Sequence, residues 1–74
     1  MYLQAIMKDG GVGYFEESLR TLGDLRDELE ARKYVMLTGL DGRDFLLATD
    51  NINVLGNASP GDVEKVRKEM SGLK

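Results

Sequence analysis

Cysteine and histidine are both missing from the 74 residues of this chain. These two side chains supply most protein nucleophiles, most general bases near neutral pH and most transition-metal ligands. Their absence excludes disulfide bonds and metal sites built on thiolate or imidazole. The remaining carboxylates, hydroxyls, lysines and tyrosines need a deep pocket to shift their pKa values, which a chain of this length rarely builds. We therefore expect no enzymatic activity, no metal and no cofactor.

Long apolar runs are also missing, and no run approaches the roughly 20 residues that span a bilayer. The segment Met1–Lys8 lacks the basic flank and the small-residue cleavage site of a signal peptide, so we expect a cytoplasmic protein without membrane contact. The net charge of −3 argues against general nucleic-acid binding, which normally shows a basic excess.

The length predicts one domain over residues 1–74, near the lower limit of what folds unaided. Small domains compensate for a small core with disulfides, a metal or a second chain. Because the composition removes the first two routes, we expect a homodimer.

Two strands and a helix are predicted in the first half of the chain. Alternating side chains indicate strands over Tyr2–Lys8 and Val12–Glu16. The segment Asp9–Gly11 between them is typical of a hairpin turn. The hydroxyl and carboxylate at the two ends of Thr21–Asp24 fit a helix start, and leucines at spacings of three and four predict a helix over Leu22–Lys33.

Three strands and a second helix are predicted in the second half. Asp41-Gly42 is a strong hairpin signal between two apolar segments, and Ser59 before a proline is typical of a helix start. The predicted elements are strands over Tyr34–Leu40, Asp44–Thr49 and Ile52–Leu55, and a helix that begins after Ser59 and ends at Gly72.

The resulting order, β-β-α-β-β-β-α, predicts an α+β fold with a mainly antiparallel, meander-like sheet and two helices. The strands Tyr34–Leu40 and Asp44–Thr49 carry large apolar side chains on both faces. Antiparallel strands open to water on one face usually alternate apolar and polar residues, so both faces need a cover. The two helices could cover opposite faces, or one face could be covered by a second copy of the chain, which we favour.

The central hairpin supplies the predicted contact residues for a partner protein. If Asp41-Gly42 forms a two-residue turn, one face of the hairpin is shared by four large side chains. These predicted interface residues are Tyr34, Met36, Phe45 and Leu47.

A nucleic-acid site is the alternative, because the last predicted helix is the most basic segment. Its candidate contacts are Lys65, Arg67 and Lys68, although Glu64 and Glu69 interleave with them. A dimer would present this modest basic patch twice, with two-fold spacing.

Three other groups have simple structural explanations. The glycines that follow Asp9 lack the Lys-Ser/Thr of a phosphate-binding P-loop, so a hairpin turn is favoured. The asparagine-rich segment after Asp50 offers oxygen ligands, but its spacing does not match a calcium-binding EF-hand loop. A carboxylate site from Asp41, Asp44 and Asp50 lacks a nucleophile and a base.

In element order, the opening hairpin, the helix start at Thr21-Leu22-Gly23-Asp24-Leu25 and the later strands look like a β-grasp, ubiquitin-like domain. That resemblance implies a shape and no function, because the chain ends in Ser71-Gly72-Leu73-Lys74 rather than in an exposed Gly-Gly tail. In size the chain also resembles small accessory proteins of bacteria and phages. We expect a non-enzymatic, homodimeric interaction module that regulates or inhibits a larger protein.

Overall fold

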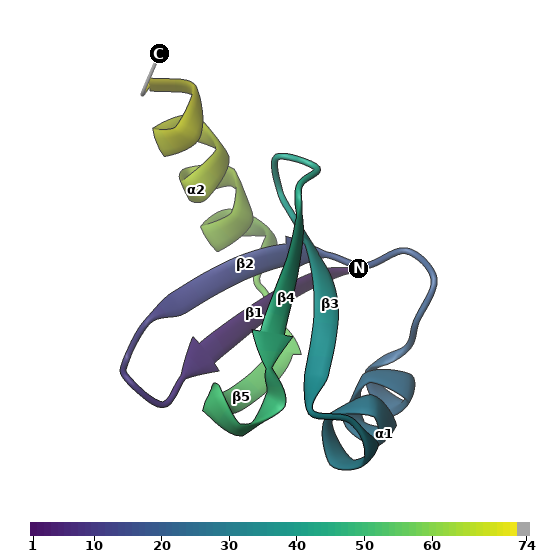
Figure 1. Cartoon of the computed structure of the whole chain (residues 1–74). Helices are drawn as coiled ribbons and strands as arrows, with labels where there is room; N and C mark the ends of the chain where they lie inside the picture. Colours follow the sequence, from purple (N-terminus) through teal and green to yellow (C-terminus); the bar gives the residue numbers. More distant parts are fainter. Residues whose placement is uncertain (73–74) are drawn as a thin grey trace.

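The computed structural model describes residues 1–72, which form a five-stranded antiparallel sheet and two α-helices (Figure 1). The element order β-β-α-β-β-β-α confirms the predicted α+β fold. In chain order the elements are β1 (Tyr2–Met7), β2 (Val12–Glu16), α1 (Leu22–Ala31), β3 (Tyr34–Gly39), β4 (Asp44–Ala48), β5 (Ile52–Asn57) and α2 (Pro60–Gly72).

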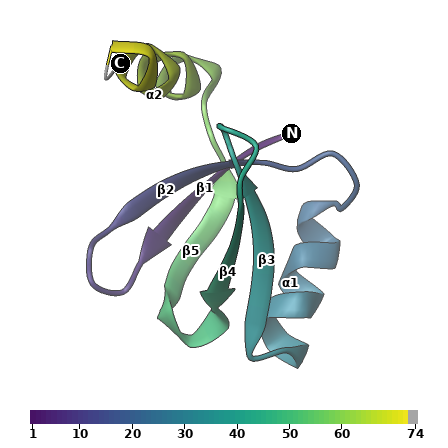
Figure 2. The same cartoon turned by 45° about the horizontal axis from the view of Figure 1, so that its top comes forward.

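The strands are ordered β4-β3-β2-β1-β5 across the sheet, so β1 to β4 form a meander and β5 returns to pair with β1. A single short 3₁₀ helix, Thr49–Asn51, joins β4 to β5 although these strands occupy opposite edges. The sheet therefore curls, and β4 and β5 approach each other where this short connection joins them (Figures 1 and 2). Every strand pair is antiparallel in the described residues, as the sequence predicts.

The hydrophobic core lies on the concave face of the curled sheet, where α1 packs beside β3 (Figure 2). Leu25 of α1 is fully buried against this face. The core residues are Leu3, Ala5, Phe15, Leu25, Val35 and Leu37, with Met7, Leu22, Leu29, Leu47, Ile52 and Leu55 packed around them.

Both hairpins turn through a three-residue loop in which an aspartate precedes a glycine. Gly10 and Gly42 adopt positive φ angles of 94° and 85°, a backbone conformation that glycine reaches without steric cost. The preceding aspartates, Asp9 and Asp41, each accept a backbone hydrogen bond from the residue after the glycine. The amide of Gly11 is therefore already bonded within the turn, as the hairpin interpretation of this glycine-rich segment predicts.

Helix α1 begins as predicted and ends earlier. Thr21 and Asp24 form the reciprocal capping box, with Asp24 N–H donating to Thr21 Oγ1 at 3.1 Å. The predicted end at Lys33 is wrong, because Arg32 is already extended (φ −123°, ψ 152°) and its neighbour Lys33 accepts a hydrogen bond from Thr49. The chain must leave the helix there to enter β3, and this tertiary demand overrides local helix preference.

Helix α2 begins after Ser59, whose hydroxyl accepts the Asp62 N–H at 3.2 Å, and it points away from the sheet (Figure 2). Val63 is its one buried residue through position 71. Leu73 and Lys74 of the predicted tail lie outside the described residues. Neither helix in the described part of the chain is long and apolar enough to cross a membrane.

Candidate functional site

Three large apolar side chains lie exposed on the convex face of the β3–β4 hairpin. Met36 and Leu46 are direct cross-strand partners, and Tyr34 lies two residues before Met36 on the same face. Tyr34, Met36 and Leu46 are 56%, 53% and 64% exposed, whereas Val35 and Leu37 on the opposite face are 1% exposed. We call Tyr34, Met36 and Leu46 the outer patch.

The predicted grouping of four interface residues is wrong, because the hairpin register differs from the predicted one. Gly39 N–H donates to Arg43 O at 2.7 Å, which leaves three residues in the loop instead of two. A shift of one residue moves every side chain of a strand to the other face. Phe45 and Leu47 therefore face the core, and Leu46 joins Tyr34 and Met36.

Phe45 and Leu47 thus contribute to the core side of the hairpin. The Phe45 ring lies edge-on to Phe15, with 6.1 Å between centroids, and packs close above Gly39. Leu47 pairs with buried Val35 and packs against the core. The less favoured alternative, in which the two helices cover opposite faces of the hairpin, is wrong, since α1 packs at the concave face and the outer patch stays exposed.

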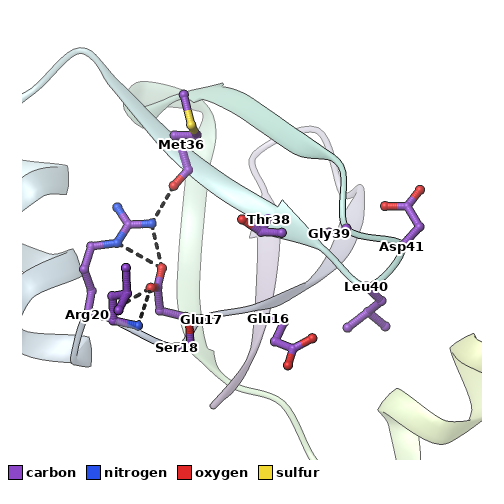
Figure 3. A pocket seen from close by; sticks show the side chains of 11 residues that line it. Glu16, Glu17, Ser18, Arg20, Met36, Thr38, Gly39, Leu40 and Asp41 are labelled. Carbon is purple, nitrogen blue, oxygen red and sulfur yellow. Dashed lines mark hydrogen bonds and ion pairs between the residues drawn. The ribbon is translucent and has the colours of Figure 1, made fainter.

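A hollow of about 750 Å³, lined by both polar and apolar side chains, lies beside Met36, between the loop before α1 and the β3–β4 turn (Figure 3). Among the carboxylates that line it, Glu16 lies 3.7 Å from Arg67, and Asp41 is paired with Arg43. Leu19 is the most exposed large apolar residue beside the hollow. Sequence reasoning missed Leu19 because it belongs to no periodic segment. The hollow therefore combines ion-paired side chains with apolar surface next to the outer patch.

The wall of this hollow is held by an ion cluster around Arg20. Its guanidinium contacts Glu17 at 2.6 Å and Glu28 at 2.9 Å, and it donates to the Met36 carbonyl at 2.6 Å. The Glu17 carboxylate also accepts the backbone N–H groups of Leu19 and Arg20. The cluster thus fastens the loop between β2 and α1 to the middle of β3 (Figure 3).

The same contacts determine the charge of the cluster. Burial raises the pKa of Glu17. The hydrogen bonds from Arg20 and from two backbone N–H groups lower this pKa by more, so it lies below its ordinary value of 4.5. Burial lowers the pKa of Arg20, and the bonds to Glu17 and Glu28 more than reverse this. Both groups of the Glu17–Arg20 pair are therefore charged at neutral pH.

The three basic residues of the nucleic-acid alternative lie along α2 and are all exposed. Arg67 is already engaged, because its guanidinium stacks 5.3 Å from the centre of the Tyr2 ring and lies 3.7 Å from the Glu16 carboxylate. Lys65 and Lys68 remain on a helix that also exposes acidic residues. This arrangement dilutes the basic surface.

The remaining polar candidates do not converge on a reaction centre. Asp41 is engaged by Arg43 at 2.6 Å, Asp44 accepts a hydrogen bond from Thr38, and Asp50 lies beyond the far end of β4. Within residues 1–72 no three acidic side chains are grouped closely enough to hold a metal ion.

Comparisons with protein-family models, with curated proteins and with solved structures gave no match to this chain.

Proposed function

We propose that this chain is a non-enzymatic protein-binding domain that contacts a larger protein through the outer patch and thereby regulates or inhibits it. The observation that supports this proposal is the exposure of Tyr34, Met36 and Leu46 on one face of a hairpin whose other face is part of the core. Contiguous apolar surface on a small domain is a common mark of protein contact.

The surroundings of the patch favour a partner with a particular chemistry. Asp44 precedes Leu46 by two residues on the patch side of β4 and, within residues 1–72, accepts a hydrogen bond only from the hydroxyl of Thr38. Two carboxylates of the adjoining hollow, Glu16 and Asp41, are already paired with arginines of this chain. An apolar centre flanked by the carboxylate of Asp44 complements a partner segment that carries an apolar anchor and a nearby lysine or arginine. We propose a segment of this kind as the occupant.

A random peptide library displayed on phage tests this proposal, with the purified chain as bait. We expect enriched peptides that combine apolar residues with a basic residue. Met36→Asp should weaken the enriched peptides at least about tenfold, because burial of a methionine side chain contributes roughly 1.5–3 kcal/mol. The substitution keeps the backbone carbonyl that Arg20 binds.

Val54→Asp is the matched control, since Val54 is also an exposed apolar strand residue, at 50%, but lies on β5 outside the patch. Circular dichroism should show that both variants are folded. The proposal is wrong if no peptide is enriched, or if Met36→Asp binds as well as the unsubstituted chain. Equal loss in both variants would also contradict a site at the outer patch.

A further inference from the structure

Strand β4 is a sheet edge with unpaired backbone groups facing outward. Two hydrogen bonds mark the ends of the β3–β4 ladder. Gly39 N–H donates to Arg43 O at one end, and Thr49 N–H donates to Lys33 O at the other. Bonded and non-bonded pairs alternate along an antiparallel ladder. The peptide groups of Asp44, Leu46 and Ala48 therefore point away from β3, and β4 has no other strand neighbour in the described chain.

Beyond the charge of Asp44 at its first position, this edge has no lysine, proline or bulge that would block strand pairing. Soluble proteins protect such edges with lysines, prolines, bulges or inward-pointing charges. After Asp44, β4 reads Phe-Leu-Leu-Ala without a bulge. The opposite edge, β5, has a register irregularity against β1, and its Asn53, Gly56 and Asn57 weaken it as a pairing surface. The contrast indicates that β4, and not β5, is kept open for another strand.

The chain also exposes more surface than a monomer of its mass. Its accessible area is 5263 Å², whereas about 4,500 Å² is expected for 8.2 kDa. The radius of gyration, 12.2 Å, exceeds the roughly 11 Å of a compact chain of this length. The protruding α2 contributes to this excess of roughly 700 Å², so the excess by itself does not locate an interface.

We propose that two copies of the chain pair antiparallel through β4, with the two-fold axis at Leu46. This register aligns all five residues of β4 and places Asp44 opposite Ala48 of the second copy, so no like charges meet. Phe45, still 41% exposed, then lies opposite the second copy's Leu47. Pairing through β4 would join two outer patches into one larger contact surface. The role of the dimer therefore rests on the proposed function of the outer patch.

Light scattering and sedimentation across a dilution series test this dimer. We expect twice the monomer mass of 8.2 kDa at high concentration and the monomer mass after dilution. Leu46→Pro removes an outward N–H without breaking the β3–β4 ladder, so it should yield a monomer at all concentrations. Asn57→Pro makes the same change at an outward position of β5 and should remain dimeric. Should Leu46→Pro fail to fold, Leu46→Lys places two charges at the axis and has the same expected result.

A cross-linking test reads the axis directly, since the chain has no native cysteine. The two Leu46 residues would form a hydrogen-bonded antiparallel pair with Cβ atoms about 5.5 Å apart, which is too wide for an unstrained disulfide. A short reagent that reacts with two thiols should therefore cross-link Leu46→Cys in high yield. Val54→Cys, similarly exposed, should cross-link at least tenfold more slowly. A monomeric parent chain, or a dimer that survives both Leu46 variants, overturns the pairing. Neither result affects the Met36→Asp peptide assay, so the two proposals fail separately.

Discussion

Glu17→Gln tests whether the ion cluster under the candidate site stabilises the fold. The Glu17 side chain is only 8% exposed and accepts four hydrogen bonds, two from the Arg20 guanidinium and two from backbone N–H groups. Glutamine has almost the same shape, but it removes the negative charge and turns an NH₂ donor toward other donors. Loss of a charged partner within a mostly buried pair costs about 2–4 kcal/mol. For a domain of this size, that is a large part of the total stability.

Urea unfolding at pH 7, followed by far-ultraviolet circular dichroism, measures this loss. With a slope of about 1 kcal/mol per M urea, the midpoint should fall by roughly 2 M or more. Asp27→Asn is the matched control, because Asp27 is 71% exposed and lies 3.7 Å from Arg26, an arrangement that contributes less than about 0.5 kcal/mol. A loss below 1 kcal/mol in Glu17→Gln would refute the reasoning that the cluster fastens the loop to β3.

Two further predictions concern pH and the central turn. Because the folded-state pKa of Glu17 lies below 4.5, its contribution to the free energy of unfolding is complete above pH 4.5 and is lost as the pH falls through the lowered pKa. Urea titrations at acid pH should therefore show the parent chain losing stability faster than Glu17→Gln. Parallel curves for the two chains would contradict this. Gly42→Ala should cost about 1 kcal/mol of unfolding free energy, because Gly42 has a φ of 85°. Gly61→Ala is the control, since Gly61 lies in the first turn of α2 with open space around it, and this change should be neutral or stabilising. Equal effects of the two substitutions in calorimetry would argue against strain at the turn.

Local chemistry was sufficient to predict the start of both helices and the element order. The Thr21–Asp24 capping box and the Ser59 cap each form within four residues, so their outcome depends little on the rest of the chain. The end of α1 was not predictable in the same way. Arg32 and Lys33 are acceptable helix residues, and only the contact between Lys33 and Thr49, 16 residues away, places them outside the helix.

The composition of the candidate site depended on a turn that the sequence leaves ambiguous. Asp-Gly fits a two-residue turn with both residues at positive φ, and it equally fits the end of a three-residue loop with only the glycine there. Both hairpins of this chain adopt the second form. Alternation along the strands could not decide between them, because Met36 and Leu37 are both apolar. The predicted face correctly joined Tyr34 and Met36, wrongly added Phe45 and Leu47, and left out Leu46.

The exposed edge at β4 follows from a long-range feature, the return of β5 to β1. A continuing meander would have paired β5 with β4 and hidden the outward groups of Leu46. Instead the curl of the sheet brings its two edges near enough for the short connection Thr49–Asn51 to cross the open side. After this connection β5 pairs with β1 and not with β4. An apolar strand with a free edge is a hazard for a monomer and suits a chain that pairs. The same topological step that leaves β4 open therefore makes a second strand beside Leu46 the most direct way to complete the sheet.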